Sequence, residues 1–258
     1  MRPELAIEPG SKKPALLIAA HGDLGGSAHN AALRALVEAV RARLPDMPVV
    51  CGVLNGEPAV EAACAELAGH RIVVYPLFMS GGYYVETVLP ERLGLATAGN
   101  AGSRDVTILP PLGLDPALSA LVARRVRDTM PANPYSAAGT SVLVIAHGSA
   151  SGHPQPRLAT EAFADGLRQC LKTQSVSTAY LEEPPFAEDA VAALSPRSVV
   201  VSLFVGKGSH GGADVADILA KAGKSYVPVI GPVGADRQIA DLVIAALRHE
   251  LTGERKVA

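Results

Sequence analysis

The chain has 258 residues, of which 48% are apolar and 19% charged, and its formal net charge is -2. This composition is typical of a packed globular protein. The charge supplies no field that would gather nucleic acid or an anionic membrane. No apolar stretch approaches the roughly 20 residues of a membrane span, and the N-terminus has no signal-peptide core. We therefore predict a cytoplasmic protein that binds neither nucleic acid nor membrane.

Short apolar runs rich in Val, Ile and Leu predict strands that are buried on both faces, at 15–20, 72–78, 142–146 and 198–205. Helical patterns lie at 28–44, 58–68, 157–171 and 186–194. Alternating strands and helices predict an α/β fold with a doubly wound parallel sheet in each half. A segment rich in Pro and Gly at 131–139 predicts a linker between a first domain at 14–130 and a second at 140–250.

The two halves repeat one another at long range. A strand that ends in Ala-Ala-His-Gly returns as Ile-Ala-His-Gly, which places His21 and His147 126 residues apart. A later strand reaches Phe78 in the first half and Phe204 in the second, and these are again 126 residues apart. An offset that holds over more than fifty residues indicates internal duplication. We therefore expect two similar domains in which His21 superposes on His147.

The histidine side chains follow the first strand of each half. Ligands bind outside the carboxyl ends of parallel strands, so His21 and His147 are expected to face a crevice. A histidine that only caps a strand end is the alternative. The glycine-rich loop after Phe204 contains His210, and the first half has Tyr84 at this position. Only the second half is therefore predicted to bring two imidazoles to one crevice.

A third loop contributes acid side chains. It contains Glu57 in the first half and Glu182 and Glu183 in the second. Glu57 matches Glu183 at the offset of 126, whereas the Leu-Asn and Leu-Glu pairs match Asn55 with Glu182 at 127. This register leaves both Glu182 and Glu183 as candidates, and a solvated loop acid is the alternative for each.

Two neutral imidazoles and a carboxylate in one crevice suit two tasks. Nitrogen and oxygen ligands hold divalent iron, cobalt or nickel. An imidazole also accepts protons, because it titrates near neutral pH. Metal insertion into a tetrapyrrole requires both tasks, since the macrocycle loses its pyrrole protons as the ion enters. We expect no cofactor beyond the substrate metal ion, and the cysteines show no CxxC spacing that would indicate a zinc or iron–sulfur site.

In this order the motifs resemble those of the sirohydrochlorin chelatases, the long, two-domain class II chelatases. The resemblance covers nearly the whole chain and includes the His-Gly turns, the Leu-Glu loop, the loop with Phe-x-x-x-Gly-x-His and the segment at 111–118. It implies two chelatase-like domains and a lyase that inserts Fe²⁺ or Co²⁺ into a polycarboxylate tetrapyrrole such as sirohydrochlorin. Iron, for sirohaem, is favoured because the C-terminal residues lack the histidine-rich or cysteine-containing tail of some cobalt-inserting relatives.

The resemblance also implies roles for individual residues. His147 and His210 would bind the metal and receive the pyrrole protons, with Glu182 or Glu183 assisting. His21 is a further candidate metal ligand. The sequence departs from the long-form pattern because the first half has no second histidine. Either the cleft combines functional residues of both halves, or the first half is inactive and only lines the cleft.

Cations are expected to hold the carboxylates of such a substrate. Lys207 and Arg157 are the candidates, although a solvated charge on a helix face is the alternative for Arg157. Ser149 and Tyr84 complete the residues expected to contact the substrate. Two other functions fit the pattern: a non-catalytic carrier of tetrapyrrole or metal that uses the same cleft, and an α/β enzyme that binds phosphate in its glycine-rich loops. Neither loop has the spacing of a Walker A or dinucleotide fingerprint.

Overall fold

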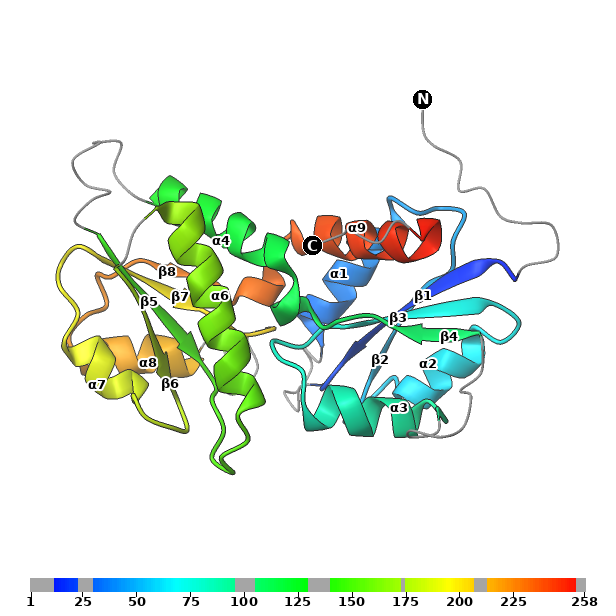
Figure 1. Cartoon of the computed structure of the whole chain (residues 1–258), viewed down its shortest axis with the longest axis horizontal. Coiled ribbons are helices and arrows are strands. Elements are labelled where there is room, and N and C mark those ends of the chain that lie inside the picture. Colours follow the sequence, from blue (N-terminus) through cyan, green and yellow to red (C-terminus); the bar gives the residue numbers. More distant parts are fainter. Residues whose placement is uncertain are drawn as a thin grey trace.

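The computed structural model describes residues 12–22, 30–95, 105–129, 140–172, 175–206 and 213–253. They form two four-stranded parallel sheets with the same order, β2-β1-β3-β4 in the first half and β6-β5-β7-β8 in the second (Figure 1). The strands are β1 (Pro14–Ala20), β2 (Val49–Val53), β3 (Arg71–Pro76), β4 (Val106–Ile108), β5 (Ser141–Ala146), β6 (Val176–Tyr180), β7 (Ser198–Ser202) and β8 (Val229–Ile230). This confirms the predicted α/β fold with two similar, doubly wound parallel sheets.

Helices cover both faces of each sheet. They are α1 (Ala31–Arg41), α2 (Val60–Glu66), α3 (Leu89–Arg92), α4 (Pro116–Thr129), α6 (Gln155–Leu171), α7 (Ala187–Ala192), α8 (Ala213–Lys221) and α9 (Ile239–Thr252). A π-helix, η2 (Tyr84–Val88), precedes α3, and short 3₁₀ turns η3 (Leu112–Leu114) and η4 (Val233–Ala235) precede the last helix of each half. No helix within the described ranges has the length and apolar character needed to cross a membrane.

The last helix of each half packs with the other half. Helix α4 lies along α6, and α9 lies along α1 (Figure 1). Gly166 lets α4 approach closely, because a Cβ at this position would lie 2.6 Å from Ser119 Oγ. The Ser119 hydroxyl donates to the carbonyl of Phe163 at 3.1 Å. The exchange merges the facing sides of the two sheets into one continuous core, so each half needs the other to bury its sheet.

An ion pair between Arg125 and Asp236 connects α4 with the second half. Arg125 donates from Nε and Nη2 to the two carboxylate oxygens of Asp236, at 2.7 and 2.9 Å. Burial raises the pKa of Asp236, but the hydrogen bond from Arg125 and that from the backbone N–H of Gln238 outweigh burial and hold the pKa below its usual value.

We expect Arg125→Ala to lower the free energy of unfolding by about 1 kcal/mol, because the pair is bidentate but its arginine is partly exposed. A lowered folded-state pKa means that the pair stabilises the fold above the unfolded-state pKa of Asp236, and that this contribution is lost as the pH falls through the folded-state value. Urea denaturation should therefore show the difference at neutral pH and a smaller one below about pH 4. Arg124→Ala is the control, and an equal, pH-independent loss in both variants would contradict the prediction.

Candidate functional site

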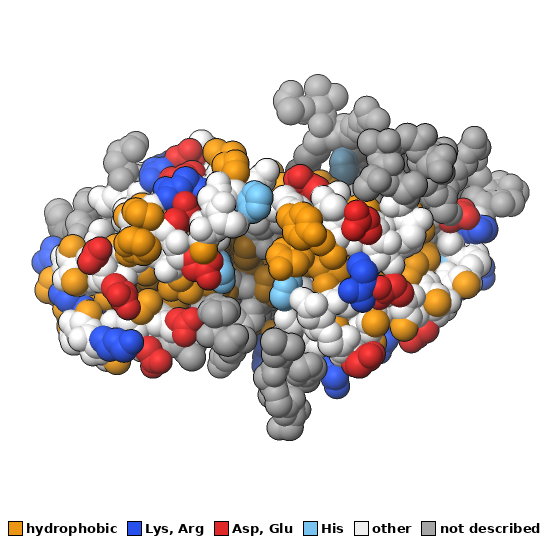
Figure 2. Space-filling view, turned by 90° about the horizontal axis from the view of Figure 1, so that it is seen from below, with side chains coloured by type: hydrophobic (Ala, Val, Ile, Leu, Met, Phe, Trp, Pro, Cys, Tyr) orange, Lys and Arg blue, Asp and Glu red, His pale blue; other side chains and the backbone are white. Residues whose placement is uncertain are grey.

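The strand-end loops of the two halves meet at a shared hollow. Gly82 lies against the second half, since a Cβ there would be 3.2 Å from Gln155 Cβ. Gly206 approaches the first half, with its Cβ position 3.7 Å from Ala32. Figure 2 shows histidine side chains on both sides of the hollow between the halves, with hydrophobic side chains along its border. The loops at the carboxyl ends of both sheets therefore border the same hollow.

In the second half, His147 lies beside Glu182. Nδ1 of His147 is 3.5 Å from Oε2 of Glu182, and each side chain is about two-fifths exposed, at 42% and 38%. The backbone N–H of Glu182 donates to the carbonyl of His147 at 3.1 Å, and the N–H of Ala150 donates to the Glu182 carboxylate at 3.3 Å. The structure thus brings one predicted imidazole and one candidate acid together, at a place that a ligand can reach.

Equivalent hydrogen bonds identify the register of the acid loop. The N–H of Asn55 donates to the carbonyl of His21 at 2.8 Å, as that of Glu182 does to His147. Glu182 is therefore the counterpart of Asn55, and Glu183 is the counterpart of Gly56. The loop follows the offset of 127, which was one of the two registers that the sequence left open.

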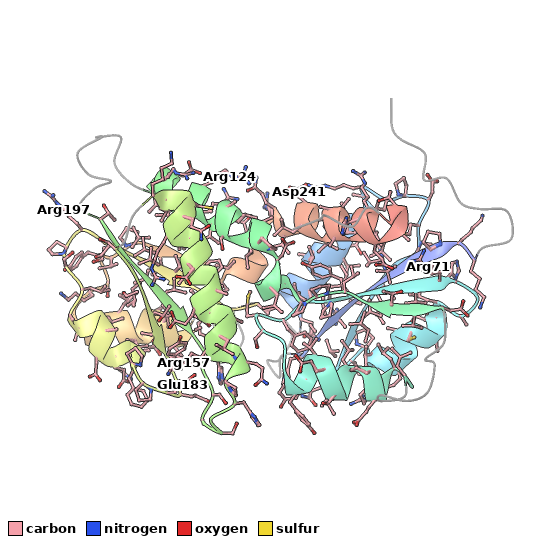
Figure 3. The ribbon with its side chains drawn as sticks, in the orientation of Figure 1. Arg71, Arg124, Arg157, Glu183, Arg197 and Asp241 are labelled. Atoms are coloured by element: carbon pink, nitrogen blue, oxygen red, sulfur yellow. The ribbon has the colours of Figure 1, made fainter. Side chains whose placement is uncertain are left out.

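Glu183 is held by Arg157 (Figure 3). Nη2 of Arg157 lies 2.8 Å from Oε2 of Glu183, whose side chain is only 17% exposed. The guanidinium carbon also lies 4.6 Å from the centre of the Tyr180 ring. The hydrogen bond to Glu183 raises the pKa of Arg157. Of the two candidate acids, Glu182 lies beside His147. Glu183 pairs with Arg157, which the sequence analysis gave as a candidate for binding the substrate.

We expect Arg157→Ala to lower the free energy of unfolding by about 2 kcal/mol, because it leaves a largely buried carboxylate without its partner. Urea denaturation measures this loss. The double variant Arg157→Ala/Glu183→Gln should regain most of it, since no unpaired charge is left. Unchanged stability in Arg157→Ala together with a raised KM would show instead that Arg157 serves the substrate alone.

In the first half, His21 has different hydrogen-bond partners from those of His147. Nε2 of His21 lies 3.2 Å from the side-chain nitrogen of Asn55, and Nδ1 lies 3.2 Å from the carbonyl of Gly22. An amide N–H beside Nε2 makes that nitrogen the acceptor, so the network assigns the proton to Nδ1. The Tyr84 ring stands edge-on to the imidazole, with the ring centres 4.8 Å apart. Both ring nitrogens of His21 are thus engaged within the first half.

Two predicted residues, Lys207 and His210, lie outside the described residues. The described chain follows β7 to Gly206 and resumes at α8. Ser149 follows His147 by two residues and accepts a hydrogen bond from the N–H of His153 at 3.1 Å, so its side chain stabilises its own turn. In the ranges that the structure describes, no three His, Cys, Asp or Glu side chains are grouped to hold a metal.

Asn55 and Tyr83 were not singled out from the sequence. Asn55 occupies the position of Glu182 in the repeat, so the alternative register contained a signal for it. Tyr83 is exposed and contacts Tyr84, with the ring centres 5.7 Å apart. It has no aromatic counterpart in the second half, where Ser209 follows Gly208, so the repeat gave it no signal.

An open pocket of about 620 Å³ adjoins Glu182 on the side of α7 and α8. Carboxylates dominate the charged groups that line it: Glu182, Glu188, Asp214 and Asp217 face one cation, Lys221. Excess negative charge in a concave site attracts cations and repels anions. This side of Glu182 therefore suits a metal ion better than a polycarboxylate.

Comparisons with known proteins agree with this architecture. The CbiX family matches residues 15–129 and 141–250. Among solved structures, the chain is similar to CbiX, described as the terminal enzyme for biosynthesis of siroheme in denitrifying bacteria, with 30% identity, a TM-score of 0.72 and coverage of 91% of this chain and 98% of that chain. No curated protein matches the chain.

More distant structures show the same fold. SirB from Bacillus subtilis, solved with Fe³⁺, is 18% identical, with a TM-score of 0.72 over 94% of this chain and 98% of that one. The multi-domain protein DR2241 from Deinococcus radiodurans is 24% identical, with a TM-score of 0.70, and the match covers 92% of this chain and 55% of that one. At these identities the similarity concerns the fold alone.

Proposed function

The chain belongs to the CbiX family, and from this premise we propose that it is a sirohydrochlorin chelatase, a lyase that inserts a divalent metal ion into the tetrapyrrole. The observation that carries the proposal is the pairing of His147 with Glu182, 3.5 Å apart, at the end of β5. The 30% identical CbiX, described as the terminal enzyme of siroheme biosynthesis, supports the choice of substrate.

In this proposal, the imidazole of His147 takes a pyrrole proton as the metal enters the ring. The Glu182 carboxylate faces the positive charge that the imidazole gains, and the N–H of Ala150 holds that carboxylate in place. Imidazole nitrogen and carboxylate oxygen also suit transient binding of Fe²⁺ or Co²⁺. We assign His210 as the second imidazole, which the loop after β7 would supply.

The two substrates would approach Glu182 from different sides. The carboxylate-lined pocket between α7 and α8 favours the metal ion. The macrocycle, which carries many carboxylates of its own, would lie in the hollow between the halves. We further propose that the protein acts in the cytoplasm without a resident cofactor. We also propose that neither nucleic acid nor a membrane is its partner, for which the low net charge is the supporting observation.

Lys207 is proposed to bind a peripheral carboxylate of the macrocycle. Such a contact is equally strong in the ground state and the transition state, so Lys207→Ala should raise KM several-fold and leave kcat nearly unchanged. Steady-state kinetics with varied sirohydrochlorin measure both constants. A collapse of kcat at constant KM would place Lys207 in the chemistry instead.

We propose Fe²⁺ as the physiological metal, because the relative CbiX is described as acting in siroheme biosynthesis. The test is the initial rate of sirohydrochlorin consumption, followed by absorbance without oxygen, with Fe²⁺, Co²⁺ and Ni²⁺ in turn. The highest kcat/KM is expected with Fe²⁺. A clear preference for Co²⁺ would overturn the choice of metal and keep the chelatase activity.

A further inference from the structure

An exposed apolar surface borders the hollow at the junction of the two halves. Tyr83 is 62% exposed and Tyr84 is 46% exposed. Leu114 and Leu158 are also exposed, so four of the seven large hydrophobic side chains that are exposed in the described ranges belong to this one region. Hydrophobic side chains are visible along the border of the hollow in Figure 2. Exposed apolar groups that gather at one place indicate a binding surface.

Contacts at the glycines before Tyr83 locate this surface at the junction of the halves. A Cβ on Gly81 would lie 3.9 Å from Leu114 Cδ1. Gly82 lies close to Gln155, the first residue of α6, since a Cβ on Gly82 would be 3.2 Å from Gln155 Cβ. Leu158 is three positions further along α6 and therefore shares a face with Gln155. The surface thus joins η2, η3 and the start of α6, a few residues after His147.

The aromatic rings form a connected series. The ring of Tyr83 meets that of Tyr84 at an interplanar angle of 64°, with the ring centres 5.7 Å apart. Tyr84 in turn stands edge-on to His21, at 89° and 4.8 Å. The series extends from the end of β1 to solvent, and its length suits a large planar ligand better than a single small group.

The turn that carries the tyrosines is held before any ligand binds. The carboxylate of Glu86 accepts a hydrogen bond from the N–H of Gly82 at 2.9 Å. Gly82 has a φ of 98°, which favours glycine. Tyr83 directly precedes the π-helix η2 and Tyr84 is its first residue; π-helices are rare overall but frequent at functional sites. A surface ordered in advance loses little entropy when it binds a ligand.

We propose that the Tyr83–Tyr84 pair is the surface on which the tetrapyrrole ring rests while the second half carries out metal insertion; this inference rests on the proposed function. The face of a conjugated macrocycle is apolar and its periphery is charged, which matches a phenol ring, because it has an apolar body and a polar hydroxyl. The acidic pocket beside Glu182 disfavours a polycarboxylate. The carboxylate of the tyrosine turn, Glu86, is engaged by Gly82.

This assignment gives the first half a task of its own. Both ring nitrogens of its histidine have hydrogen-bond partners, Asn55 and Gly22, and its second histidine position is a tyrosine. The first half has thus exchanged a proton acceptor for a stacking surface. The ring would be held by one half and metallated by the other, across the contact between Gly82 and Gln155.

The test compares Tyr83→Ala, Tyr84→Ala and the double variant with wild type. Metal-free sirohydrochlorin is titrated into each protein and its Kd is read from the absorbance change; KM and kcat are then measured with Fe²⁺. We expect each single variant to raise Kd and KM about ten-fold, as loss of an aromatic contact does, with kcat changed by less than about two-fold. Tyr83→Phe and Tyr84→Phe should restore binding, and Co²⁺ affinity should be unchanged in all variants.

Tyr226→Ala is the matched control. Tyr226 is also exposed, at 57%, but it precedes β8 and so lies at the edge of the second sheet opposite the carboxyl ends of its strands. An unchanged Kd in the double tyrosine variant, or an equal loss in Tyr226→Ala, would overturn the stacking surface. Binding that depends on the tyrosines but leads to no turnover would contradict the chelatase proposal and support the stacking surface. Turnover that does not depend on the tyrosines would support the chelatase proposal and contradict the stacking surface.

Discussion

Removal of either second-half imidazole is expected to cost on the order of 100-fold or more in kcat, so His147→Ala and His210→Ala should be nearly inactive. In the proposed mechanism each change takes away a metal ligand and a proton acceptor together, and a positioned acid–base group alone contributes about 100-fold or more. For His147, the change also removes the group that faces Glu182 at 3.5 Å. Single-turnover and steady-state rates with sirohydrochlorin and Fe²⁺ measure the loss.

The matched control is His21→Ala. His21 has the same place in the repeat, but Asn55 and Gly22 engage its ring nitrogens. Its neighbour Tyr84 is a phenol at the position of His210, so the first half has no second imidazole to receive a proton. We therefore expect a loss of less than about ten-fold. Comparable losses in all three folded variants would mean that the chemistry spans both halves, and a loss confined to His21→Ala would assign it to the first.

Gly22→Ala is expected to lower the free energy of unfolding by about 4 kcal/mol. Gly22 has a φ of 95°, and a Cβ there would lie 2.0 Å from the carbonyl oxygen of Asn55. The loop that holds His21 would have to move to make room. Urea denaturation gives the free energy of unfolding of wild type and variant.

Gly69→Ala separates the two causes of this loss. Gly69 has a similar φ of 88°, but nothing lies within 4 Å of its Cβ position. Only backbone strain applies there, so a loss of about 1 kcal/mol is expected. If both variants lost the same free energy of unfolding, the close approach to Asn55 would not explain why glycine is required after His21.

The central strands and the repeat could be predicted from the sequence. Strands β1, β3, β5 and β7 are buried on both faces, so each appears as a continuous apolar run. The edge strands β4 and β8 have only three and two residues, too few for a periodic pattern. The His-Gly turns were recognisable because their glycines adopt positive φ, 95° at Gly22 and 75° at Gly148, in both halves.

Other features depend on contacts that no local pattern encodes. The exchange of α4 and α9 between the halves leaves the periodicity of each helix unchanged, so the sequence shows the helices but not their partners. The acid loop was ambiguous because the offset changes from 126 to 127 between β1 and β2, and only backbone hydrogen bonds settle it. Arg157 was predicted to bind the substrate because its ion pair with Glu183, 26 residues away in the chain, is not visible in the sequence.

The most direct test of a catalytic role is the number of turnovers. Wild-type protein is mixed with metal-free sirohydrochlorin and Fe²⁺, both in large excess, and the absorbance of the metal-free ring is followed to completion without oxygen. The chelatase account predicts that the ring is consumed far beyond one equivalent of protein, at a rate above that of the protein-free mixture. Uptake that stops at one equivalent would contradict it and would identify a carrier of tetrapyrrole or metal.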